Sequence, residues 1–87
     1  LSCSPNPFNA ATEISYNVPD NGEYTLNVYN INGQHIKTLG NGFADAGNHS
    51  AIWNGTDENG NTVTSGLYIV NFRQGNNKTS QVISLIK

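Results

Sequence analysis

The sequence is poor in charge, in cysteine and in long apolar runs. Only 11% of its 87 residues are charged, and only four are Lys or Arg. An average soluble domain has roughly 25% charged residues. Nucleic-acid binding needs a basic stripe that displaces counterions, so we expect no nucleic-acid partner. No apolar run approaches the roughly 18 residues that span a bilayer, so we expect no transmembrane segment. Cys3 is the only cysteine, which excludes an internal disulfide.

Neutral hydrogen-bonding residues take the place of the missing charge. The sequence contains 15 Asn and 14 Ser plus Thr, a composition typical of extracellular β-modules rather than of cytosolic enzymes. Its 87 residues form one domain, near the lower size limit at which a core holds without disulfides or metals. Because the chain opens on LSCSPNPFN rather than on Met, we expect residues 1–87 to be a fragment of a larger secreted protein.

Short segments of period-two alternation run along the chain. In TEISYNV, for example, Ile14, Tyr16 and Val18 share one face of the expected strand. Five Asn-Gly pairs occur among these segments, and Asn-Gly is favoured in tight hairpin turns. No stretch shows helical spacing over more than two turns. The sequence therefore predicts an all-β antiparallel sandwich of about seven strands. The expected strand segments are 12–18, 24–30, 35–39, 49–54, 67–74 and 80–87.

The expected core follows from the same alternation. Trp53 is its largest member and lies mid-chain, where both sheets can close around it. Near the end of the chain, VISLI is too uniformly apolar to show which of Ile83 and Leu85 faces inward, so we expect one of them in the core. The other expected core residues are Phe8, Ile14, Tyr16, Val18, Leu26, Val28, Ile36, Leu39, Val63, Tyr68, Val70 and Phe72.

The segment WNGTDENGNTVTSGLY alternates oxygen-bearing side chains, as a calcium loop does. An EF-hand loop counted from Asp57 would need glycine at its sixth position and glutamate at its twelfth, where this chain has Thr62 and Tyr68. The bend and the strongest ligand are both missing. We therefore expect Asp57 to form an Asx turn and Asn59-Gly60 to turn a hairpin, without a metal.

No catalytic constellation stands out either. His35 and His49 are the only histidines, and neither has a Cys, His or carboxylate at metal-ligand spacing. No nucleophile elbow or oxyanion glycine accompanies the serines. We expect a chain that is not an enzyme, with no catalytic residue, no cofactor and no metal site.

Long segments of the chain resemble a known family when their order and spacing are considered together. The segments are SPNPFNAATEISYNVPDNGEYTLNVYNINGQHIKTL, then AGNHSAIWNGTDENGNTVTSGLYIV, then a terminal apolar strand closed by Lys87. From Pro5 to Lys87 the chain resembles the type A C-terminal sorting domain of type IX secretion cargo. The same fold, with repeats of NG and SG-x-Y, also occurs in the immunoglobulin-like part of flagellar hook-cap scaffolding proteins.

The resemblance implies a seven-stranded immunoglobulin-like (Ig-like) sandwich at the C-terminus of a secreted enzyme or adhesin from a Bacteroidetes-like bacterium. Such a domain directs its cargo through the periplasm and across the outer membrane to the cell surface. The implied partners are the outer-membrane type IX translocon and a sortase-like surface peptidase, and we expect a monomer. The chain departs from the family pattern at Ser4, where an aromatic is usual, at Ala51, and in its few terminal lysines.

The resemblance also places the transport signal in the terminal segment. The recognition residues that it implies are Lys78, Ile83, Leu85, Ile86 and Lys87. An edge strand formed by KTSQVISLIK would offer backbone groups for β-augmentation by a partner. The segment is equally compatible with being only the last strand of the core.

Two other functions fit the same fold. The first is a structural interaction module of the hook-cap scaffold type. The second is a carbohydrate-binding module that uses Tyr24, Tyr29 or Phe43 as a stacking platform. A carbohydrate module should align at least two aromatics on one face, and the outward aromatics expected here are few and scattered. We therefore rank it last.

Overall fold

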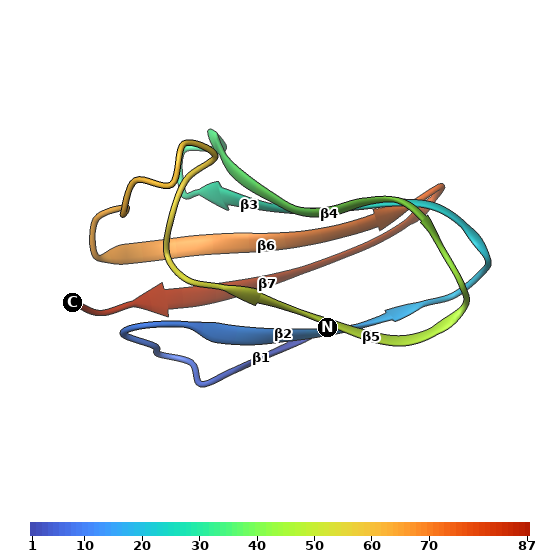
Figure 1. Cartoon of the computed structure of the whole chain (residues 1–87), viewed down its shortest axis with the longest axis horizontal. Coiled ribbons are helices and arrows are strands. Elements are labelled where there is room, and N and C mark those ends of the chain that lie inside the picture. Colours follow the sequence, from blue (N-terminus) through green and yellow to red (C-terminus); the bar gives the residue numbers. More distant parts are fainter.

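The computed structural model describes all 87 residues as two antiparallel β-sheets packed face to face (Figure 1). One sheet has the strand order β1-β2-β5 and the other has the order β4-β3-β6-β7. The strands are β1 (Ser2–Ser4), β2 (Thr12–Val18), β3 (Gly22–Asn30), β4 (His35–Ala44), β5 (Gly47–Trp53), β6 (Gly66–Gln74) and β7 (Asn77–Leu85). The predicted all-β sandwich of about seven strands is confirmed. No helix in the structure is long and apolar enough to cross a membrane.

The strands differ from the expected segments mainly in length. β2 matches its segment, whereas β1 was not expected at all. β4 continues through Asn41-Gly42, which the sequence suggested as a turn, because β3 pairs with it as far as Gly22↔Ala44. The tight turn between β6 and β7 lies instead at Gly75-Asn76, between the paired residues Gln74 and Asn77. Gly75 has a φ of 57°, and a positive φ at the first central residue is the pattern of a type II′ hairpin.

The core agrees with the alternation of the strands, with one correction. We expected one of Ile83 and Leu85 inside, but both are buried. Residues two apart on a strand point to the same face, so the core takes both or neither. Ile36, Leu39 and Val63 pack against the core but are only partly buried. The buried cluster consists of Phe8, Ile14, Tyr16, Val18, Leu26, Val28, Trp53, Tyr68, Val70, Phe72, Ile83 and Leu85.

Trp53 lies at the centre of this core with none of its surface exposed. Its ring centroid is 5.6 Å from that of Phe8 and 5.2 Å from that of Tyr68. The indole Nε1 donates a hydrogen bond of 2.9 Å to the carbonyl oxygen of Thr56, so the buried polar atom is satisfied. The Tyr68 hydroxyl donates one of 2.6 Å to the carbonyl of Thr64, four residues upstream, an arrangement like the tyrosine corner of Ig-like sandwiches.

Replacing Trp53 should test how much of the fold depends on this residue. We expect Trp53→Ala to lower the free energy of unfolding by about 3–5 kcal/mol, the usual cost of emptying a large aromatic site. Chemical denaturation of the purified domain measures it. The matched control is Ile52→Ala, on the neighbouring residue whose side chain is 67% exposed. Equal stability of the two variants would contradict the central role of Trp53.

Candidate functional site

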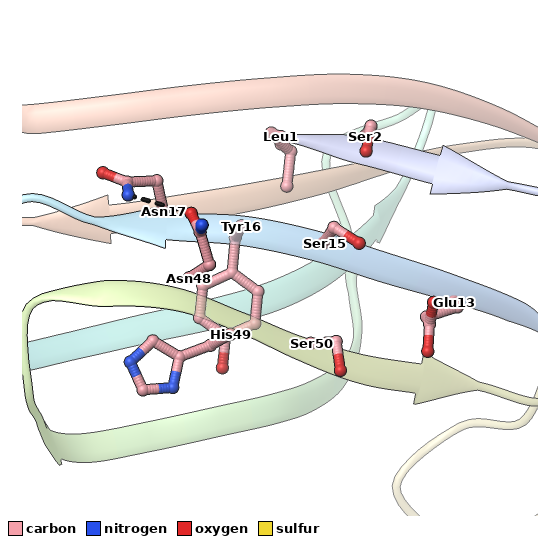
Figure 2. Close-up of a pocket in the computed structure, with 9 residues that line it drawn as sticks. All are labelled: Leu1, Ser2, Glu13, Ser15, Tyr16, Asn17, Asn48, His49 and Ser50. Carbon is pink, nitrogen blue, oxygen red and sulfur yellow. Dashed lines mark hydrogen bonds between the residues drawn. The ribbon is translucent and has the colours of Figure 1, made fainter.

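The largest depression on the surface is open and polar. It has a volume of about 600 Å³ and lies on the sheet formed by β1, β2 and β5 (Figure 2). Two cross-strand rows contribute to it, Ser2↔Ser15↔Ser50 and Asn17↔Asn48. The Asn17 side-chain amide donates a hydrogen bond of 3.1 Å to that of Asn48. The lining residues are Leu1, Ser2, Glu13, Ser15, Tyr16, Asn17, Asn48, His49 and Ser50.

The histidine in this depression is not arranged for catalysis. His49 Nε2 donates a hydrogen bond of 2.7 Å to the carbonyl oxygen of Asp45. The imidazole stacks on the ring of Tyr16, with 5.7 Å between centroids and 21° between planes. Its hydrogen bonding is thus directed at backbone rather than at the serine hydroxyls, whereas general-base catalysis needs a nucleophile within hydrogen-bond reach. The structure also contains no group of three or more His, Cys, Asp or Glu residues that could hold a metal ion.

Tyr16 is the one tyrosine whose ionisation the fold shifts strongly. Its ring packs against those of Tyr24 and Phe72, with centroid distances of 6.0 and 5.6 Å. Burial in this aromatic cluster, followed in importance by the nearby Tyr24 hydroxyl, raises the pKa of Tyr16 to about 12. Burial has this effect because it disfavours the charged phenolate.

The raised pKa predicts a loss of stability in alkali. Unfolded tyrosine ionises near pH 10, as in model peptides, whereas folded Tyr16 ionises near pH 12. The native state therefore binds more protons between these values, so the stabilisation from Tyr16 is complete below pH 10 and falls as the pH rises toward 12. Urea denaturation at several pH values should show this decline in the parent and a shallower one in Tyr16→Phe. Parallel declines in both proteins would contradict the prediction.

The connection between β5 and β6 contains the Asx turn expected at Asp57. The Asp57 carboxylate accepts hydrogen bonds from the backbone N–H groups of Asn59 and Asn61, at 2.9 and 3.0 Å. Gly60 has a φ of 82°, and the chain turns between Thr56 and Thr62, which form an isolated antiparallel bridge. The Asx turn and the reversal of the chain at Asn59-Gly60 are both confirmed.

The same connection covers the outer edge of β4. The backbone N–H of Glu58 donates a hydrogen bond of 3.2 Å to the carbonyl oxygen of Ile36. The Glu58 carboxylate in turn accepts one from the backbone N–H of Thr38. Lys37 Nζ donates one of 3.1 Å to the Thr56 hydroxyl. The two Glu58 contacts occupy backbone groups at the edge of β4 that would otherwise be open to another strand.

An N-terminal segment covers the end of β7, the other edge strand of the four-stranded sheet. Asn6 acts like a short strand, because its side-chain amide donates to the Val82 carbonyl at 3.3 Å and accepts from the Ser84 N–H at 3.1 Å. The N–H of Phe8 donates to the Ser84 carbonyl at 2.9 Å, and the Ile86 N–H donates to the Phe8 carbonyl at 2.8 Å. The motif SPNPF thus covers the edge of β7 along the second half of this strand.

The recognition residues implied by the resemblance are not brought together on one surface. Ile83 and Leu85 face the core, whereas Lys78, Ile86 and Lys87 are exposed. Lys78 pairs with Arg73 near the β6–β7 turn, whereas Lys87 lies past the opposite end of β7. There the Lys87 ammonium donates a hydrogen bond to the Val63 carbonyl, and its backbone N–H donates one of 3.0 Å to the Ser65 hydroxyl.

The three aromatics considered for carbohydrate binding do not form a platform. Tyr24 stacks against the core residues Tyr16 and Phe72. Tyr29 is half-buried and lies edge-on to His35. Phe43 is 68% exposed, but it pairs with Glu23, six residues from Tyr29 on β3, a separation of about 20 Å.

Asn6 is the residue with a specific role that residue-level reasoning missed. Its signal in the sequence is the PNPF motif, which belongs to the segments that carry the family resemblance. We expect Asn6→Ala to lower the free energy of unfolding by about 1–2 kcal/mol, because two hydrogen bonds are lost. Amide hydrogen exchange at Ser84 should also accelerate. Asn9→Ala, at another exposed position of the same segment, is the control. An unchanged Ser84 exchange rate in Asn6→Ala would contradict the edge-covering role.

Comparisons with known proteins agree with this architecture. Neither the curated proteins nor the solved structures yield a match to the chain. A comparison with protein families matches the FlgD Ig-like domain over residues 8–78, most of the sandwich. The match includes Phe8, Trp53 and Tyr68, the three aromatics at the centre of the core, and ends at Lys78 within β7. The chain belongs to the FlgD Ig-like domain family.

Proposed function

We propose that this domain is a non-catalytic structural module that acts through contacts with other proteins. Its membership of the FlgD Ig-like domain family carries the proposal. The side chains fit it, because the buried apolar residues form one core cluster and the largest depression is open and polar. Small-molecule sites are usually concave and mostly apolar, with a few convergent polar groups. The sheet edges and the exposed surface, which includes apolar residues such as Ile31 and Leu67, remain for a partner.

A second, more specific function is sorting and anchoring of a secreted cargo by the type IX system. The observation in its favour is the end of the chain, where the resemblance places the signal. Asn6 and Phe8 fix the last part of β7, and Val63 and Ser65 fix Lys87, so the folded domain presents one defined surface there. A translocon that recognises a folded domain needs such a surface. On this proposal the cargo crosses the periplasm and outer membrane and meets a sortase-like peptidase at the cell surface.

A reporter experiment separates the two functions. Residues 1–87 are fused behind a fluorescent protein carrying a signal peptide, in a bacterium that has the type IX system. Sorting predicts fluorescence at the cell surface or in the medium. It also predicts reduced export when Lys78→Ala and Lys87→Ala are combined. We expect Lys78→Ala to change the free energy of unfolding by no more than about 0.5 kcal/mol. Lys87→Ala also removes the hydrogen bond to the Val63 carbonyl, so the free energy of unfolding of the double variant is measured beside its export, and lost export in a variant as stable as the parent would not reflect unfolding.

Retention of the intact fusion in the periplasm would exclude sorting and leave the structural module. The structural module has its own test in the parent protein. Deleting the domain there should leave the parent's intrinsic activity unchanged while its assembly or localisation is lost. Loss of intrinsic activity in a parent that remains folded would contradict the non-catalytic role.

A further inference from the structure

The first half of β7 has an open edge. In an antiparallel ladder, alternate residues direct their backbone N–H and C=O groups toward the neighbouring strand. Asn6 and Phe8 bind Val82, Ser84 and Ile86 from the side opposite β6, so the even-numbered residues of β7 face outward. Lys78 and Ser80 have the same parity. No backbone hydrogen bond outside the strand ladders reaches either of them.

Two cations lie beside this open edge without a partner. Arg73 and Lys78 are exposed and directly opposite each other on β6 and β7. The other two of the chain's four basic residues, Lys37 and Lys87, donate side-chain hydrogen bonds to Thr56 and to the Val63 carbonyl. Like charges directly opposite on an antiparallel pair are destabilising. The pair therefore does not stabilise the ladder, and it leaves two positive charges beside the edge, with Glu23 the carboxylate that lines the same small depression as Arg73.

A small depression adjoins the same edge on the inner side. It has a volume of about 210 Å³ and lies between the two sheets. Tyr16 and Phe72 give it an aromatic wall, Leu1 and Pro19 add apolar lining, and Asn77 to Thr79 of β7 form its rim. A strand added to β7 would point alternate side chains toward this depression and the others toward the outer face, where Lys78 and Arg73 lie.

We propose that the edge of β7 at Lys78 and Ser80 binds an extended acidic segment of a partner protein as a fifth strand of the four-stranded sheet. The backbone groups of Lys78 and Ser80 pair with the segment. Its outward Asp or Glu residues face Arg73 and Lys78, and its inward apolar residues cover the depression. Asn6 limits the added strand to a short one, because it already occupies Val82 and Ser84. This inference rests on the proposed function, since it supplies the kind of partner that such a module binds.

The other sheet edges fit such a partner less well. The outer edge of β4 is covered by the Glu58 connection at Ile36 and Thr38. Register shifts against β3 at Ile36 and Leu39 make this edge irregular, and Gly42 farther along has a φ of 98°. β1 and β5 have outer edges too, but none of the four basic residues lies on either strand. Only the start of β7 combines open backbone groups with unpaired charge.

A designed peptide tests the proposal on the intact domain. The probe is an acetylated and amidated peptide of alternating Glu and Val, and the control peptide replaces each Glu with Lys. With isotope-labelled residues 1–87, NMR titration should shift the amide signals of Lys78 and Ser80 and slow their hydrogen exchange. The Lys peptide should leave them unchanged. No shift with millimolar Glu peptide, or equal shifts with both peptides, would overturn the proposal.

Matched variants separate the charge from the backbone pairing. Lys78→Glu should weaken binding by about tenfold, whereas Lys87→Glu, the same charge change past the other end of β7, should leave it unchanged. Ser80→Pro removes an outward N–H without breaking the ladder to β6, so it should abolish binding in a folded domain. Equal weakening by the two Lys variants would overturn the proposed place of binding. Full binding by a folded Ser80→Pro variant would overturn the strand pairing.

Two further outcomes distinguish this proposal from its alternatives. Concentration-dependent dimerisation that protects Lys78 and Ser80, and that Ser80→Pro abolishes, would identify the occupant as a second copy of the chain and overturn the acidic partner. Failure of the peptide to bind, together with lost localisation when the domain is deleted, would overturn this site while leaving the structural module intact.

Discussion

The contact between Phe8 and Trp53 is the interaction on which the rest of this sandwich depends. Trp53 ends β5, in the three-stranded sheet, and Tyr68 packs on it from β6, in the four-stranded sheet. Phe8 packs on Trp53 too, while its backbone binds Ser84 and Ile86 at the end of β7. One residue therefore takes part in core packing and in closing a sheet edge. In a domain this small, which has no internal disulfide, such double use offsets part of the entropy cost of folding.

Which sheet edges are covered and which are open links the fold to its proposed function. An uncovered edge is a template for another strand, and natural proteins cover or interrupt most of them. Here Asn6 and Phe8 cover the end of β7, and Glu58 covers the start of β4. No such segment covers the first half of β7, and Arg73 and Lys78 lie beside it. The open edge is therefore the place where we propose that the domain binds its partner.

Much of the fold could be predicted from the sequence because it depends on local pattern. The alternation in TEISYNV placed Ile14, Tyr16 and Val18 correctly in the core, and the spacing of Asp57, Asn59 and Asn61 indicated the Asx turn. The local sequence pattern gave the wrong result where pairing with another strand determined the length of a strand or the face that a side chain takes. Pairing with β3 carried β4 through Asn41-Gly42, and the uniform apolar run hid that Ile83 and Leu85 share one face. The sequence predicted the terminal strand, but it did not show that the first half of this strand, the proposed site, has an open edge.

The sequence by itself determined the fold class, the period-two faces and the large aromatic core, because each follows from local backbone preference and from the burial of apolar side chains. Only the tertiary structure decided which edges are open and which cations are free. Asn6 meets Ser84 across 78 positions of sequence, and Glu58 meets Thr38 across 20. Contacts over such separations depend on how the sheets pack, and no local pattern encodes them. The open edge at Lys78 and Ser80 is what those distant contacts leave uncovered.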